Sequence, residues 1–391
     1  APSFVAIHRN LPIPEYTVQN KSAVVVISTA RMKLKYKKGK GPFTKDNLTI
    51  TSAKGMLPFE WTPGTTQKGN LKGTDRTLDG FEGNHNIYSH QDMKLEDGLL
   101  STDGWTLIDD SKNFLFDDSE WPWVETRENK DGQDWYFMAY GHDYKAALKD
   151  YTAFAGKVPL PPRYAFGYWW SRYWSYSDKE MRQLVDNFHT YNIPLDVLVV
   201  DMDWHYTEPG FGGWTGWTWN RRLFPDPAKF LGYLKDNDLK ITLNLHPADG
   251  VAPYEEKYPE MAQWMGIDTA KHEPIPWVVS DKHFMNGMLN KVLRPMEKQG
   301  VDFWWLDWQQ WMYDKKVIAG EDWAITVTRS ASREMLSYHG NRLNSNLTLL
   351  TAPQMYCMVT GAMTSVGTCS KAVKKKYSIR NFSPAGCNTV L

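Results

Sequence analysis

Three apolar runs in the middle of the chain are each followed directly by an ionisable side chain. Runs that are apolar throughout are typical of strands buried on both faces of a parallel sheet. Because the carboxyl ends of parallel strands meet at one edge of their sheet, we expect the three side chains to point into one mouth. The runs and the side chains that follow them are 195–200 with Asp201, 240–245 with His246, and 301–306 with Asp307.

Segments with helical periodicity lie between these runs. Ser177 is placed to cap the first of them. Strands that alternate with helices predict βα units around a buried parallel sheet. We predict four such units, the first starting with a strand over residues 164–170. The expected helices cover residues 178–191, 226–237 and 281–299.

The first 150 residues have a different pattern. Short β-branched and aromatic runs stand among Gly, Pro, Asn and Asp clusters, which favours a β-sandwich. A helix over 142–153 and a proline-rich stretch over 158–163 follow, and the prolines predict a domain boundary. The clearest strands are expected at 24–28, 32–36, 48–51 and 134–140.

Charge and hydropathy exclude two classes of partner. Lys and Arg together number 45 and Asp and Glu number 45, so the formal net charge is zero and no nucleic-acid surface is expected. No apolar run reaches the roughly 18 residues that a membrane helix needs, so we expect no membrane partner. The three cysteines form no disulfide framework, and four Asn-x-Ser/Thr tripeptides favour secretion only slightly, which leaves the compartment open.

The chain is rich in aromatic side chains, with 19 Trp and 20 Tyr. Such side chains fill cores or form flat platforms on which sugar rings stack. Carboxylates in a mouth with aromatic walls suit glycoside cleavage, in which one carboxylate attacks the anomeric carbon and a carboxylic acid protonates the leaving oxygen. The tryptophans expected beside the strand ends are Trp170, Trp174, Trp204, Trp305 and Trp308.

A metal site is the competing interpretation. Asp201, Asp203, His205 and His246 are residue types that bind metals. No HExxH motif and no paired Cys/His spacing accompanies them. We therefore expect no metal and no cofactor.

Several motifs together resemble one enzyme family over residues 30 to 312. They include Asn70–Gly80, Pro161–Gly167, Ser171–Tyr176, Asp201-Met202-Asp203-Trp204-His205 and Trp305-Leu306-Asp307-Trp308-Gln309-Gln310. In these stretches the chain resembles glycoside hydrolase family 31, the α-glucosidase and α-xylosidase family. The resemblance implies a β-sandwich followed by an α/β (β/α)8 TIM-type barrel, acting on an oligosaccharide or glycoside by a retaining mechanism.

The resemblance also implies roles for individual residues. Asp307 takes the place of the catalytic nucleophile on the fourth barrel strand, and Asp201 matches the residue that binds sugar hydroxyls. Trp174 and Trp305 match pocket walls. The remaining expected substrate-binding residues are His246, Asp203 and Trp204.

Two departures from the family pattern keep alternatives open. Gln309-Gln310 replaces the usual Asn-Glu, so glucose, xylose, galactose and N-acetylgalactosamine all remain candidate sugars. No motif for the general acid follows Asp307. The alternative to a retaining α-glycosidase is therefore a catalytically impaired carbohydrate-binding protein, whose exposed sheet edges would be covered in a homo-oligomer.

The expected domains are a β-sandwich over residues 1–157, the first half of the barrel over 158–313, and an unassigned segment over 314–391. About 80 residues cannot supply four further βα units of roughly 30 residues each, so the barrel is expected to be incomplete after the fourth unit. Within the last segment we expect a helix near residues 329–338.

Overall fold

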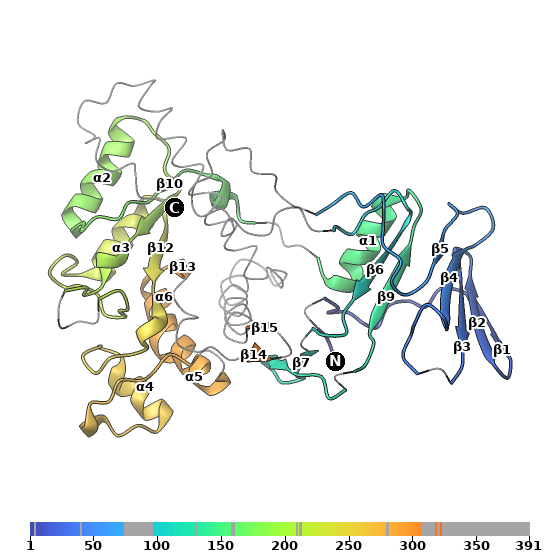
Figure 1. Cartoon of the computed structure of the whole chain (residues 1–391). Coiled ribbons are helices and arrows are strands. Elements are labelled where there is room, and N and C mark those ends of the chain that lie inside the picture. Colours follow the sequence, from blue (N-terminus) through green and yellow to red (C-terminus); the bar gives the residue numbers. More distant parts are fainter. Residues whose placement is uncertain are drawn as a thin grey trace. The chain divides into compact units, whose positions relative to one another are not determined.

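The computed structural model divides the chain into two compact units, which meet in the sequence between residues 158 and 159 (Figure 1). In the described part of the chain, no helix is both long and apolar enough to cross a lipid bilayer. The structure describes residues 1–3, 5–39, 41–73, 97–113, 115–129, 131–157, 161–208, 210, 213–278, 281–306, 317–318 and 321–322.

The first unit contains a five-stranded antiparallel sheet in sequential order. The strands expected from the β-branched runs form here, and each is paired with its neighbour along the chain. β3 alternates between half-buried and exposed residues, as a strand with one solvated face does. The strands are β1 (Tyr16–Asn20), β2 (Val24–Thr29), β3 (Met32–Lys37), β4 (Leu48–Ser52) and β5 (Glu60–Trp61).

A second layer packs on this sheet. β6 (Trp105–Asp109) pairs antiparallel with β9 (Trp135–Ala139). The core between the layers joins Leu48, Ile50 and Trp61 of the sheet to Trp105 of β6. The Trp61 ring lies 5.1 Å from that of Phe137 on β9, centroid to centroid. Two β layers thus bury one aromatic core in this region.

Three further elements complete the first unit. β7 (Leu115–Phe116) and β8 (Val124–Glu125) form an antiparallel pair. Helix α1 (Tyr144–Ala155) begins two residues later than the sequence predicts. The reason is local, because the Asp143 side chain accepts a hydrogen bond from the Ala146 N–H and so caps the helix at that residue.

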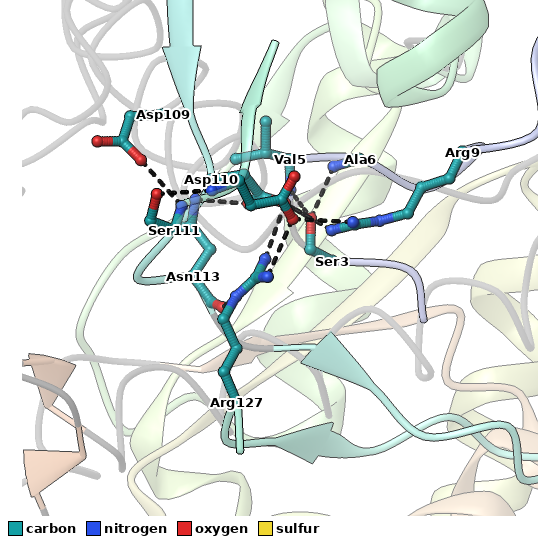
Figure 2. A network of polar contacts seen from close by, with 10 residues as sticks. Ser3, Val5, Ala6, Arg9, Asp109, Asp110, Ser111, Asn113 and Arg127 are labelled. Carbon is teal, nitrogen blue, oxygen red and sulfur yellow. Dashed lines mark hydrogen bonds and ion pairs between the residues drawn. The ribbon is translucent and has the colours of Figure 1, made fainter. Parts of the chain in front are cut away.

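A network of charged side chains ties the start of the chain to the end of β6 (Figure 2). The fully buried Asp110 carboxylate accepts hydrogen bonds from Ser3 Oγ at 2.7 Å and Arg9 Nη2 at 2.7 Å. Arg127 Nη2 donates to the same oxygen at 3.0 Å. Both guanidinium groups also reach Asp134, at 2.8 and 2.9 Å. Burial works to raise the pKa of Asp134, but the hydrogen bonds from the two arginines outweigh it and lower the pKa.

The second unit contains a parallel four-stranded sheet in sequential order, which confirms the predicted succession of parallel strands. Every second residue of a strand points to the same face of the sheet. Val197 and Val199 therefore join Trp169 and Phe303 in one apolar cluster. The strands are β10 (Trp169–Trp170), β11 (Val197–Val200), β12 (Lys240–Leu245) and β13 (Phe303–Leu306).

Two amphipathic helices connect the first three of these strands (Figure 1). Helix α2 (Asp178–Thr190) begins with the predicted cap, a capping box in which Ser177 and Glu180 bond each other's backbone N–H. It buries Met181, Leu184, Val185 and Phe188, which follow the period of a helix. Helix α3 (Pro227–Asp236) packs beside β12, and its Tyr233 hydroxyl donates to Asp186 of α2 at 2.8 Å.

The connection from β12 to β13 is longer and more varied. Helix α4 (Tyr258–Met265) was not expected from the sequence. The single helix expected over 281–299 is instead three continuous segments, in which a π-helical turn interrupts the α-helix. These are α5 (Lys282–Gly287), η6 (Met288–Leu293) and α6 (Arg294–Gln299).

The strand expected over 164–170 is wrong in its first half. Residues Arg163–Phe166 form the 3-10 turn η2, held by bonds from the Ala165 N–H to the Pro162 carbonyl and from the Gly167 N–H to the Tyr164 carbonyl. Only Trp169–Trp170 pairs with β11. The expected helix near residues 329–338 lies outside the described residues.

Short segments at residues 202–204, 247–249 and 269–271 are the 3-10 turns η3 (Met202–Trp204), η4 (Pro247–Asp249) and η5 (Thr269–Lys271). β14 (Val317–Ile318) and β15 (Glu321–Asp322) form a small antiparallel pair.

The Asp110 network predicts that two neighbouring carboxylates contribute very differently to the free energy of unfolding. We expect Asp110→Asn to lower the free energy of unfolding of the first unit by about 3 kcal/mol, since it removes the buried charge that faces two arginines. Asp109→Asn should change it by less than about 0.5 kcal/mol, because Asp109 is exposed and asparagine can still accept the Ser111 N–H. Urea titration followed by circular dichroism would measure both, and equal losses would contradict the prediction.

Candidate functional site

The register of the parallel sheet brings residues of three strands to one level near its carboxyl edge. Asn244 of β12 pairs with Trp305 of β13. Val200 pairs with Leu243, so Asp201, the next residue after β11, lies at the register position beside Asn244. The Asn244 side chain is 1% exposed, and neither its amide oxygen nor its amide nitrogen has a hydrogen-bond partner among the described residues. A buried polar group of this kind is costly to keep.

Asp201 is half-buried at the point where β11 turns into η3. Its carboxylate accepts a hydrogen bond from the Met202 N–H at 2.8 Å, which fixes the start of the turn. The side chain thus lies at the carboxyl edge of the sheet, where the sequence predicts it.

Asp203 connects η3 to the segment that follows β10. Its carboxylate accepts hydrogen bonds from the hydroxyls of Ser175, at 2.5 Å, and Thr207, at 2.6 Å. Ser175 follows Trp174, whose ring is 53% exposed and lies 4.5 Å from the Arg172 guanidinium. The contacts of Asp203 therefore hold in place the loop that carries an exposed tryptophan.

The structure separates two tryptophans that the sequence groups together. Trp305 is partly buried and packs against the cluster of Trp169, Val197, Val199 and Phe303. Trp204 is fully buried, and its indole N–H donates to the Asn244 backbone carbonyl at 2.8 Å. Trp204 thus occupies the interior as a core side chain, and we do not carry it into the proposed binding set.

Two buried histidines follow β11 and β12. His205 is fully buried, and its Nδ1 lies 3.1 Å from the Tyr206 carbonyl. Because a carbonyl only accepts, Nδ1 carries the proton. Burial lowers the pKa of His205 to about 4 although the bond to Tyr206 opposes this, so the ring is neutral near pH 7. His246 is 3% exposed and follows β12 directly.

A loop over residues 213–220, which sequence reasoning missed, covers these histidines. The Thr215 hydroxyl donates to the His246 backbone carbonyl. The Trp217 indole N–H donates to the Gly250 carbonyl at 2.7 Å. A Cβ at Gly216 would stand 2.2 Å from His205 Nδ1, so only glycine allows this approach. The alternation of Gly, Trp and Thr over 213–219 was the signal in the sequence that could have revealed this loop.

A buried glutamate anchors the same loop. Glu255 is 3% exposed and accepts hydrogen bonds from the Trp217 N–H at 3.2 Å and the Thr218 hydroxyl at 2.5 Å. Burial raises the pKa of Glu255 to about 7, although these two hydrogen bonds oppose the shift. The loop is therefore tied to a carboxyl group that titrates near neutral pH.

Within the described residues, no three His, Cys, Asp or Glu side chains are grouped to hold a metal ion. Asp307, the expected nucleophile, lies outside the described residues, as does the greater part of the Asn70–Gly80 motif, residues 74–80. The candidate site thus consists of Asp201, Asp203, His246, Trp174 and Trp305, collected at the carboxyl edge of the four strands.

The raised pKa of Glu255 predicts that the stability difference between wild type and Glu255→Gln depends on pH. Its pKa is about 7 when folded and 4.5 as a reference, so the folded chain binds more protons between these values. The contribution of Glu255 to the free energy of unfolding is complete below about pH 4.5 and is lost as the pH rises through 7. Relative to wild type, Glu255→Gln should therefore gain melting temperature steadily from pH 5 to pH 8 in scanning calorimetry.

Glu260→Gln is the matched control, since the Glu260 side chain is 52% exposed and pairs with Lys257 at the surface. We expect the melting temperature of this control variant to differ from that of wild type by nearly the same amount at all pH values. A constant offset for Glu255→Gln as well would contradict the assigned pKa.

Known proteins resemble this chain in both sequence and fold. The family model described as "Glycosyl hydrolases family 31 TIM-barrel domain" matches residues 158–352, which includes part of the segment left unassigned by the sequence. The α-xylosidase XylQ of Lactiplantibacillus pentosus is 29% identical over 163 residues, 41% of this chain and 21% of the relative. The α-glucosidase 2 of Bacillus thermoamyloliquefaciens is 32% identical over 112 residues, 29% of this chain and 14% of the relative. The aligned parts thus span less than a quarter of these two relatives.

Solved structures extend the likeness in fold. A dextranase of Flavobacterium johnsoniae, complexed with glucose, matches with a TM-score of 0.54 at 18% identity and covers 87% of this chain and 47% of that chain. An α-xylosidase from a soil metagenome, complexed with xylose, gives a TM-score of 0.55 at 13% identity. This match covers 88% of this chain and 59% of the α-xylosidase chain. These structures share the fold of this chain, and the family-model match over residues 158–352 shows that the chain belongs to glycosyl hydrolases family 31.

Proposed function

We propose that the protein is a retaining α-glycosidase in which Asp307 is the nucleophile. The observation that carries this proposal is the register of the parallel sheet, in which Asp201 and Trp305 lie at one level on either side of Asn244. Asp307 is the next residue in the sequence after β13. The family membership and the α-xylosidase and α-glucosidase relatives support the substrate class, an α-linked sugar.

The proposed reaction has two displacements. The Asp307 carboxylate attacks the anomeric carbon, the bond from that carbon to the glycosidic oxygen breaks, and a general acid transfers its proton to the departing oxygen. Water then attacks the same carbon, gives up a proton to the conjugate base, and frees the carboxylate. The anomeric configuration is inverted twice and so retained.

The other site residues bind and orient the sugar in this proposal. Asp201 accepts hydrogen bonds from sugar hydroxyls. Trp305 and the exposed Trp174 present apolar ring faces to the sugar. Asp203 acts through Ser175, because their hydrogen bond holds the Trp174 loop against η3. His246 forms the edge of the site after β12.

Hydrolysis of a panel of aryl α-glycosides tests the proposal. The panel contains the glucoside, xyloside, galactoside and N-acetylgalactosaminide. We expect turnover of at least one of them, and we expect Asp307→Asn to lower its kcat/KM by about 10⁴-fold or more, because the attacking carboxylate is lost. Proton NMR of the first product should show the α-anomer.

Asp236→Asn is the control, since Asp236 is an exposed carboxylate at the end of α3. It should leave kcat/KM unchanged. Full activity in Asp307→Asn, or a β-anomer as first product, would overturn the mechanism. Sugar binding in calorimetry without turnover of any glycoside would instead support a carbohydrate-binding protein that has lost catalysis.

A further inference from the structure

One exposed aromatic side chain near the candidate site has no role in the reaction proposed above. Among the tryptophans that the structure describes, Trp174 and Trp214 are the two with large exposure, at 53% and 48%. Trp174 follows β10 and already belongs to the expected pocket wall. Trp214 lies in the 213–220 loop, and the expected site does not include it.

Trp214 lies at the carboxyl edge of the sheet. Its ring meets that of His246 edge to face, with 4.9 Å between the centroids. His246 is the residue after β12, and β12 is hydrogen-bonded to both β11 and β13. The exposed indole is therefore adjacent to the strand end where the sequence places a substrate-binding residue.

The residues that follow Trp214 hold the backbone of its loop. Thr215, Trp217 and Trp219 are 3 to 5% exposed. Thr215 is bonded to the His246 carbonyl, and Trp217 is bonded to both Gly250 and Glu255. The exposed indole thus projects from a loop whose backbone is held by buried contacts, so little ordering entropy remains to be lost when a ligand covers it.

We propose that Trp214 is a sugar-stacking residue that binds a second sugar unit of an oligosaccharide substrate. Its exposed ring is the flat apolar surface that the C–H face of a sugar covers. Asp201 stands at a strand end, whereas Trp214 lies on a loop beyond the strand ends. The unit on Trp214 is therefore a neighbour of the unit whose bond is cleaved. This assignment rests on the proposed function for the identity of that first unit.

Calorimetric titration tests the proposal in the Asp307→Asn background, where turnover does not consume the ligand. The probes are α-linked trisaccharides of glucose, xylose and galactose, each compared with its free monosaccharide. We expect Trp214→Ala to weaken trisaccharide binding about tenfold, which corresponds to covering roughly half of one indole. Monosaccharide binding should not change. Trp214→Phe should keep most of the affinity, because it retains a flat ring.

Tyr191→Ala is the matched control. Tyr191 is 51% exposed and follows α2, toward the amino ends of the strands and so away from the site. Its removal should leave trisaccharide binding intact. Unchanged trisaccharide binding in Trp214→Ala, or no trisaccharide binding by the parent, would overturn the proposal. An equal loss of monosaccharide and trisaccharide binding would do the same.

The outcome is separable from that of the proposed function. The trisaccharide titrations measure binding in a variant that does not turn over the ligand, whereas the aryl glycoside panel measures hydrolysis by the wild-type protein. Selective loss of trisaccharide binding in a protein that hydrolyses none of the glycosides would support the role of Trp214 and refute the glycosidase.

Discussion

The hydrogen-bond register between β11, β12 and β13 is the constraint on which the candidate site depends. Side chains alternate across a strand, so a slip of one residue would move every one of them to the opposite face. In the observed register Val199, Thr242 and Phe303 lie side by side, and the next level on the same face holds Asp201, Asn244 and Trp305. The buried level of Val199, Thr242 and Phe303 thus sets the position of the level at the edge.

Buried polar groups are the second determinant, because they hold the loops above that edge. Glu255 and His205 both lie under the 213–220 loop, and their ionisation has opposite effects. Burial keeps the pKa of His205 near 4, so its contribution to stability is present above pH 6.5 and is lost as the pH falls toward 4. The buried carboxyl group has the reverse dependence. Near pH 5 to 6 neither contribution is complete. The attachment of this loop therefore depends on the ionisation of both groups in this range.

The parallel strands, the capped helices α2 and α3, and the position of Asp201 could be predicted from sequence, since apolar runs and cap residues act locally. Other features depend on contacts distant in sequence. Trp204 follows a strand end, as a pocket wall would, but the turn η3 directs its indole to a carbonyl of β12. Pro162 stands in extended conformation at the start of η2, so a 3-10 turn forms where the sequence predicts a strand. The exposed Trp214 could be recognised only once its buried neighbours were placed.

The π-helical turn η6 has a consequence for how this chain can change by insertion and deletion. Buried residues recur every four positions through it, at Phe284, Met288, Val292 and Met296. An α-helix has 3.6 residues per turn, so four-residue spacing would drift around the helix without the wider turn. Loss of one residue there would rotate all later side chains by about 100°. Glu297 would then turn away from the Trp304 indole, to which it bonds at 2.9 Å. The segment before β13 is thus intolerant of changes in length, although it lies far along the chain from Asp201.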